Sequence, residues 1–189
     1  MPFPDHFALL APFYDRLIPL AHTDTLCQHL DLPSAGLLLD VGGGTGRVAA
    51  ALAPHTAGVL VVDESLAMLR QAAEKTGLLP LAGRAEALPF PDETFPRLLI
   101  VDAWHHLADH DRAAAELWRI LAPGGLLLIE EPDIRTWAVR GIALFEKLTL
   151  MRSHFSPPAA IAARFPQAHT RIHIDGFNAW IVISKGTPA

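Results

Sequence analysis

The chain has 189 residues, 51% hydrophobic and 19% charged, which is typical of one globular domain and excludes a disordered chain. Its net charge of −5 argues against nucleic acid as the main partner, because there is no basic excess to displace counterions. The single cysteine, Cys27, excludes an intrachain disulfide framework.

The location expected from these features is the cytoplasm. A lone cysteine is consistent with a reducing compartment, and no basic segment precedes an apolar one near the first residue. The longest uncharged run, at 48–62, is interrupted by Pro54 and is too short to cross a bilayer. We therefore expect no integral membrane segment. The expected oligomeric state is a monomer or a homodimer.

The spacing of apolar residues in 1–32 predicts short, broken helices. Apolar residues recur at roughly helical intervals, but Pro12 and Pro19 interrupt them. Asp24 is placed to cap a second helix that ends near Leu30. The segment precedes the first strong strand, so it either forms a lid over the end of that strand or only covers the edge of a sheet.

From residue 37 onward, apolar strands alternate with helices. Ser65 and either Asp109 or Asp111 are placed to cap two of the helices. Continuous apolar strands separated by helices are typical of a parallel sheet buried on both faces, so the fold class is α/β. The expected strands are 37–41, 58–62, 78–82, 97–101 and 125–129.

The last fifty residues differ in pattern. Helical segments are expected at 139–151 and 158–165, followed by two strand-like runs on either side of Asp175 and Gly176. These runs predict an antiparallel hairpin, so the sheet is expected to close with a reversed strand. We interpret 1–189 as one domain with a helical N-terminal lid (1–32), a cofactor-binding core (37–131) and acceptor-side helices with the hairpin (132–189).

A glycine-rich turn follows the first strand. Residues 37–47 read LLLDVGGGTGR, so glycines at 42, 44 and 46 permit positive φ and close backbone approach to a ligand. The dinucleotide fingerprint would need a further glycine at 47, where Arg47 stands. This turn alone is a weak indication of which ligand is bound.

Acidic residues stand at or just after the ends of four predicted strands: Asp40, Asp63, Asp102 and Glu130. Because ligands of such sheets lie outside the carboxyl ends of the strands, these acids are expected to converge on one crevice. Asp63 follows Gly42 by 21 residues, where a carboxylate can accept hydrogen bonds from both ribose hydroxyls. That position indicates a nucleoside but does not distinguish one nucleoside cofactor from another.

Five stretches in order resemble the class I S-adenosylmethionine-dependent methyltransferases, and within them the small ubiquinone/menaquinone-biosynthesis-like branch. The resemblance implies a Rossmann-like fold, with a seven-stranded, mostly parallel sheet, an antiparallel last strand and helices on both faces. It also implies that the protein transfers a methyl group from S-adenosylmethionine to a small-molecule acceptor by in-line displacement. The stretches are 40–46, 62–69, 85–95, 103–107 and 121–126.

Two other functions stay open at this point. One is a protein that binds S-adenosylmethionine or S-adenosylhomocysteine without catalysis, as a sensor or an assembly subunit. The other is a nicotinamide-dependent oxidoreductase, which Arg47 and the terminal hairpin disfavour.

The resemblance also implies which residues bind the cofactor. The glycine turn would pass under the methionine moiety, with Asp40 near its amino group and Asp102 at the same end. Asp63 would hold the ribose, Met68 would pack on the adenine, and the backbone of Ala85 would meet the adenine edge. The implied cofactor-binding residues are Asp40, Gly42, Gly43, Gly44, Gly46, Asp63, Glu64, Met68, Ala85, Glu86 and Asp102.

Arg84 departs from the family pattern, which often has an acid there to accept a hydrogen bond from the adenine amine. An arginine has only donors and cannot make that contact. Either the backbone alone holds the adenine, or Glu86 substitutes, or affinity for the cofactor is weak.

Catalytic candidates are few. His105 and His106 follow the fourth strand, where the acceptor pocket of the family begins, and an imidazole can titrate near neutrality. Tyr14 would reach the cofactor or the acceptor if the N-terminal helices form a lid. The spacing of His106 and His110 lacks an H-E-x-x-H pattern, so no metal site is expected.

Overall fold

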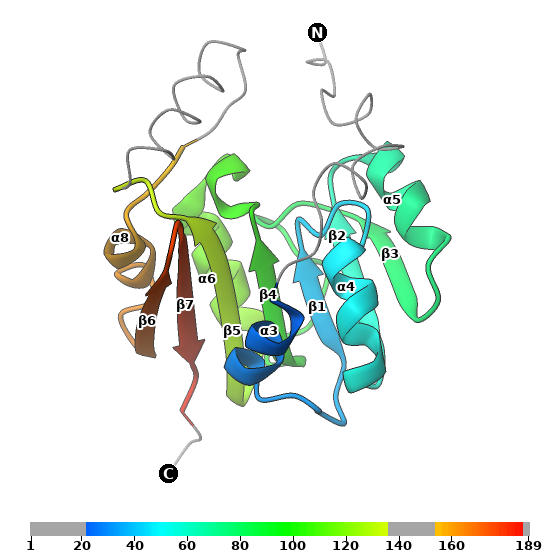
Figure 1. The fold of residues 1–189 in the computed structure, drawn as a ribbon, viewed down its shortest axis with the longest axis horizontal. Coiled ribbons are helices and arrows are strands. Elements are labelled where there is room, and N and C mark those ends of the chain that lie inside the picture. Colours follow the sequence, from blue (N-terminus) through cyan, green and yellow to red (C-terminus); the bar gives the residue numbers. More distant parts are fainter. Residues whose placement is uncertain (1–21, 136–153, 187–189) are drawn as a thin grey trace, which may run out of the picture.

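The computed structural model describes residues 22–135 and 154–186. These residues form one seven-stranded sheet in the order β3-β2-β1-β4-β5-β7-β6, with helices on both faces (Figure 1). The expected fold class is therefore confirmed. The strands are β1 (Leu38–Val41), β2 (Val59–Asp63), β3 (Leu78–Ala82), β4 (Phe95–Val101), β5 (Leu121–Pro132), β6 (His169–Asp175) and β7 (Asn178–Ser184).

Strands β1 to β5 pair in parallel, and β7 runs antiparallel to both of its neighbours. The predicted hairpin is thus present, with Gly176 between β6 and β7 in a left-handed conformation (φ +59°). Two strands are longer than expected. β4 begins at Phe95 and passes through Pro96 at a break in its register with β5, and β5 begins directly at Leu121.

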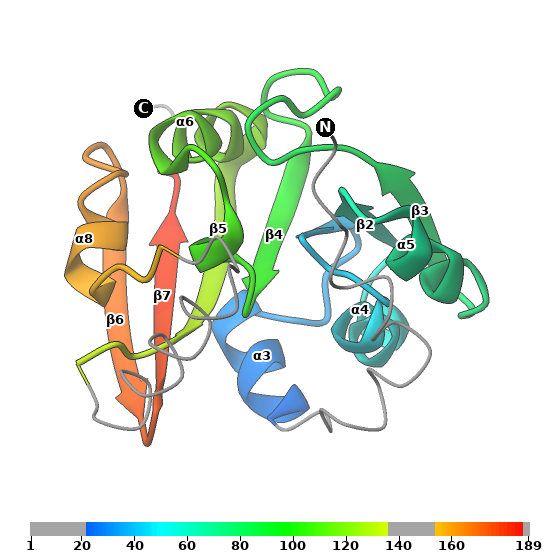
Figure 2. The ribbon, with the colours of Figure 1, turned by 90° about the horizontal axis from the view of Figure 1, so that it is seen from above.

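The central strands are buried on both faces of the sheet because most of their residues are apolar. Along β4, Leu98 and Ile100 pack into one core and Leu99 packs into the other. Helices α3 (Thr23–Leu30), α4 (Arg47–Leu52) and α5 (Leu66–Ala73) cover one face, and α6 (His110–Ile120) and α8 (Pro158–Ala162) cover the other. Figure 2 shows α3 and α4 on the side of the sheet opposite α6. Short 3-10 turns follow α4 (Ala53–His55) and β4 (Trp104–His106).

Local capping explains where two helices begin. The Ser65 hydroxyl accepts a hydrogen bond from the Met68 amide, and Asp109 accepts from the amides of Asp111 and Arg112. The expected cap at Asp24 is wrong, because α3 begins at Thr23 and His22 occupies its cap position in a left-handed conformation.

Some predicted features lie outside the described residues, namely the helices of 1–21, Tyr14 and the helix at 139–151. Within the described ranges, no helix is long and apolar enough to cross a membrane.

Candidate functional site

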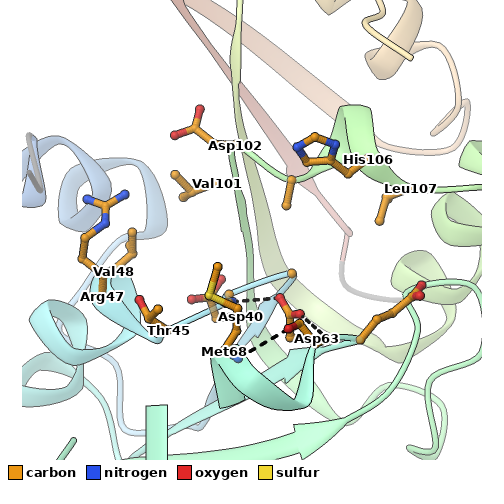
Figure 3. A pocket seen from close by; sticks show the side chains of 16 residues that line it. Asp40, Thr45, Arg47, Val48, Asp63, Met68, Val101, Asp102, His106 and Leu107 are labelled. Carbon is orange, nitrogen blue, oxygen red and sulfur yellow. Dashed lines mark hydrogen bonds between the residues drawn. The ribbon is translucent and has the colours of Figure 1, made fainter. Parts of the chain in front are cut away.

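A cavity of about 410 Å³ opens beyond the carboxyl ends of β1, β2 and β4 (Figure 3). Its walls come from the glycine turn after β1, the junction of β2 with α5, and the segment after β4. The described lining residues are Asp40, Gly42, Gly43, Gly44, Thr45, Arg47, Val48, Asp63, Glu64, Ser65, Met68, Val101, Asp102, Ala103, His106 and Leu107.

The glycine turn presents backbone to this cavity. Gly42 has φ +73°, and a Cβ there would lie 2.6 Å from the Ala103 Cβ, so the position excludes a side chain. Gly44 has φ +55°, and a Cβ there would stand 4.0 Å from both the Asp63 Oδ2 and the Met68 Sδ. The turn thus leaves open the space between these two side chains.

Asp63 fixes the geometry of the turn. Its Oδ2 accepts a hydrogen bond from the Gly44 amide at 2.9 Å, and its Oδ1 accepts from the Ser65 amide at 2.8 Å. One carboxylate therefore ties the end of β2 to the β1 turn and to the start of α5. Met68, on the first turn of α5, is held at the same wall (Figure 3).

Asp40 is a buried carboxylate that faces the cavity. It is 1% exposed, and its Oδ2 has no hydrogen-bond partner among the described residues. Burial, and secondly the charge of Asp63, raise the pKa of Asp40 to about 7, although Arg47 acts in the opposite direction. Such a group gains strongly from a cationic ligand.

A second acidic group lies where β4 and β5 end. Asp102 has φ +51°, which is uncommon for a residue with a side chain and is often found at functional sites. Burial, with a contribution from Glu131, raises its pKa. Burial and Asp102 together raise the pKa of Glu130 to about 8, while Asn178 donates a hydrogen bond to its Oε1 at 2.8 Å. Glu130 does not line the cavity, so the expectation that all four acids at strand ends converge on one crevice is wrong for this residue.

Arg47 is a site residue that the sequence analysis missed. It begins α4 and lines the cavity, and its charge lowers the pKa values of Asp40, Asp102 and Glu130. In the sequence, Arg47 showed only that the further glycine of the dinucleotide fingerprint is missing.

The two adjacent histidines have different surroundings. The His105 Nδ1 lies 2.7 Å from the Glu131 Oε2, and its ring stacks on Phe155 outside the cavity. His106 lines the cavity, but burial and the neighbouring His105 lower its pKa to about 3. The expectation that His106 titrates near neutrality is therefore wrong, because its environment disfavours the charged ring.

Three implied cofactor residues do not line the cavity: Gly46, Ala85 and Glu86. The Glu86 Oε1 instead accepts hydrogen bonds from the Ala108 and Asp109 amides at 2.9 and 3.1 Å. Its Oε2 lies 3.3 Å from the Nε of Arg84, which also pairs with Glu64. Burial alone would raise the pKa of Glu86, but these hydrogen bonds outweigh burial and lower it.

The chemistry of the site suits a cation, since four of its described lining residues are acids and the buried Asp40 Oδ2 has no hydrogen-bond partner within residues 22–135 and 154–186. Within the described ranges, no group of three or more histidine, cysteine or acidic side chains is arranged to bind a metal ion.

The sequence is similar to those of known methyltransferases. A family model described as a methyltransferase domain matches residues 39–129. The chain is 34% identical over 156 residues to a demethylmenaquinone methyltransferase of Streptomyces avermitilis, covering 82% of this chain and 66% of the relative. It is 38% identical over 104 residues to a ubiquinone/menaquinone biosynthesis C-methyltransferase of Pseudoalteromonas translucida, covering 50% of this chain and 41% of the relative.

The fold has close structural neighbours. A SAM-dependent methyltransferase from Thermotoga maritima superposes with a TM-score of 0.77 at 23% identity, covering 95% of this chain and 98% of that one. At this identity the likeness supports the fold alone. The chain spans between about two-fifths and two-thirds of the length of the two curated relatives named above.

Proposed function

This chain belongs to the class I S-adenosylmethionine-dependent methyltransferases of the ubiquinone/menaquinone-like type, and from this premise we propose that it transfers a methyl group from S-adenosylmethionine to a small-molecule acceptor. The observation that carries the proposal is the buried Asp40 carboxylate, whose Oδ2 lacks a partner among the described residues, behind an open glycine turn. A nucleoside whose amino-acid end carries an ammonium group matches these features.

The proposed contacts follow from the lining residues. Asp40 pairs with the ammonium group of the cofactor, and Gly42, Gly43 and Gly44 run under its methionine moiety. Asp63 and the adjacent Glu64 accept hydrogen bonds from the ribose hydroxyls. Met68 packs on the adenine, and Asp102 completes the acidic wall at the methionine end.

When bound, S-adenosylmethionine supplies a methyl group on a positively charged sulfur. The task of the chain is to align the acceptor with that methyl group and to exclude water, which together lower the barrier by several kcal/mol. His106 stays neutral at physiological pH, so it is suited to accept a hydrogen bond from an acceptor hydroxyl. A ring with so low a pKa is a weak general base.

We further propose that the acceptor is a flat, uncharged ring of the quinone type. The names of the two curated relatives point to this class. The wall beyond the glycine turn supports it, because the apolar Val101, Ala103 and Leu107 line the cavity together with the neutral His106.

Binding can be tested by titration calorimetry with S-adenosylmethionine, S-adenosylhomocysteine and NAD. We expect both sulfur nucleosides to bind and NAD not to bind. Asp63→Ala should weaken binding of both sulfur nucleosides by about 1–3 kcal/mol, because the ribose hydroxyls lose their acceptor and the Gly44 and Ser65 amides that shape the turn lose theirs. Asp175→Ala, on an exposed strand end, is the control and should leave affinity unchanged. Failure of both sulfur nucleosides to bind the unaltered protein would overturn the proposal.

Transfer is tested separately, with methyl-labelled cofactor and a reduced naphthoquinone that lacks the ring methyl group. Labelled product in the presence of the protein supports an enzyme. Tight binding without product from this acceptor or from a pool of extracted small molecules would support a non-catalytic binding protein instead.

A further inference from the structure

A zwitterionic amino-acid end needs a cation as well as acids in its binding site. We propose that Arg47 binds the carboxylate of the ligand and makes the cavity selective for nucleosides that carry a free α-carboxylate. This inference rests on the proposed function and assigns one more residue to the same site.

The lining residues carry more negative than positive charge. The described lining holds four acids, Asp40, Asp63, Glu64 and Asp102, and a single arginine. His106 does not add a cation, since its pKa is about 3. A ligand carboxylate in this cavity therefore has one guanidinium partner among the described residues and would be repelled by every other charged wall.

The position of Arg47 suits such a ligand. It begins α4 directly after the glycine turn, and Figure 3 shows its guanidinium group beside the cavity on the same side as Asp102. The ammonium and carboxylate groups of the ligand share one carbon atom. Pairing the ammonium with Asp40 therefore brings the carboxylate to the adjoining wall, where Arg47 lies.

The Arg47 guanidinium group has hydrogen-bonding capacity that the described residues do not satisfy. Its Nε is buried and has no hydrogen-bond partner among the described residues. Among the described residues, the ion pairs within 4.0 Å do not include Arg47, so no acid of that part of the chain holds its guanidinium group. A planar fork of donors remains, which fits a carboxylate in a bidentate manner.

The test compares two ligands that differ only in this carboxylate, S-adenosylmethionine and its decarboxylated analogue. Their dissociation constants are measured with the unaltered protein and with Arg47→Gln, Arg47→Lys and Arg70→Gln. Arg70 is an exposed arginine on α5 outside the cavity lining, so its variant is the matched control.

The unaltered protein should prefer the carboxylated ligand by roughly 10- to 100-fold, the usual range for a charge-assisted contact. Arg47→Gln should weaken the binding of S-adenosylmethionine by about this factor. The decarboxylated analogue should bind as well as before or more tightly, because a positive charge near a dication has been removed. Arg47→Lys should be intermediate, since it keeps the charge and loses the fork, and Arg70→Gln should change neither ligand.

If Arg47→Gln lowers the affinity for both ligands equally, the inference is overturned. Arg47 would then affect binding only through the stability of the fold or through the charge of the neighbouring acids. If Arg47→Gln does not fold, the ratio of the two affinities in Arg47→Lys decides in the same way. An unaltered protein that binds neither sulfur nucleoside would overturn the proposed function, and this inference with it.

Discussion

At the scale of single residues, the site is organised by carboxyl groups that are costly to ionise because they are removed from water. Asp40, Asp102 and Glu130 all have raised pKa values, chiefly because burial penalises their charged forms. A cationic ligand relieves this penalty. Asp40 and Asp102, which line the cavity, therefore favour binding of a cation although burial penalises their ionised forms in the free protein.

The raised pKa of Asp40 predicts that binding depends on pH. Below pH 7 the free protein holds a proton on Asp40, and an ammonium group must displace it, so affinity for S-adenosylmethionine should rise with pH. We expect the dissociation constant to fall by about tenfold between pH 6 and pH 8. Calorimetry in buffers of different ionisation enthalpy measures the released proton directly.

Asp40→Asn is the control for this prediction. It should bind S-adenosylmethionine weakly, with the pH dependence below pH 7 abolished. An unaltered protein whose affinity is flat from pH 6 to pH 8 would show that Asp40 does not receive the ammonium group.

At the scale of elements, short segments are held together by side chains that accept hydrogen bonds from backbone amides. Asp63 joins the β1 turn to α5, Ser65 caps α5, and Glu131 accepts from the Trp104 amide at 2.7 Å. Glu86 joins the loop after β3 to the start of α6 in the same way. These contacts fix the loops around the cavity, because the strands alone do not determine where their loops go.

This arrangement predicts a structural role for Glu86. Glu86→Ala leaves the Ala108 and Asp109 amides without their acceptor, which should lower the free energy of unfolding by about 1–3 kcal/mol in urea denaturation. Glu74→Ala, at an exposed position, should change it by less than about 0.5 kcal/mol. Unchanged stability with weakened cofactor binding would instead favour contact between Glu86 and the adenine.

At the scale of the whole molecule, the order of the strands creates the cavity. The chain proceeds from β1 outward to β3, then returns to the other side of β1 as β4. A crevice opens outside the carboxyl ends of such strands where the order reverses, and here it lies between β1 and β4. The antiparallel β7 pairs with β5 and brings Asn178 to Glu130, a buried acid at the end of β5 that lies outside the cavity lining.

The buried Glu130 predicts how stability of the free protein changes with pH. Its pKa is about 8 in the fold, against about 4.5 in an unfolded chain, so the stability due to its proton is lost as pH rises toward 8. Glu130→Gln mimics the protonated form and keeps the acceptor for Asn178. It should have little effect at pH 5 and should stabilise the fold by about 1–4 kcal/mol at pH 9.

Thermal or urea unfolding at several pH values measures this difference, with Glu74→Gln as an exposed control. If Glu130→Gln lowers stability equally at pH 5 and pH 9, the carboxyl group is ionised in the fold and the predicted burial effect is absent.

The sequence by itself determined the alternation of strands and helices, the terminal hairpin and the glycine turn. It also predicted that acids end the strands, and Asp40, Asp63 and Asp102 do meet at one cavity. These features follow from local rules, namely hydrophobic period, turn residues and the position of strand ends. The family resemblance further indicated the cofactor, because several motifs had to occur in order.

Only the tertiary structure decided which neighbouring polar residues face the cavity and which serve the fold. His105 binds Glu131 from 26 residues away while His106 lines the cavity, and Glu86 binds amides 22 and 23 residues away. Arg47 became a site residue only when the turn brought it beside Asp40 and Asp102. Burial and charge at these positions depend on distant contacts, so no local pattern could reveal them.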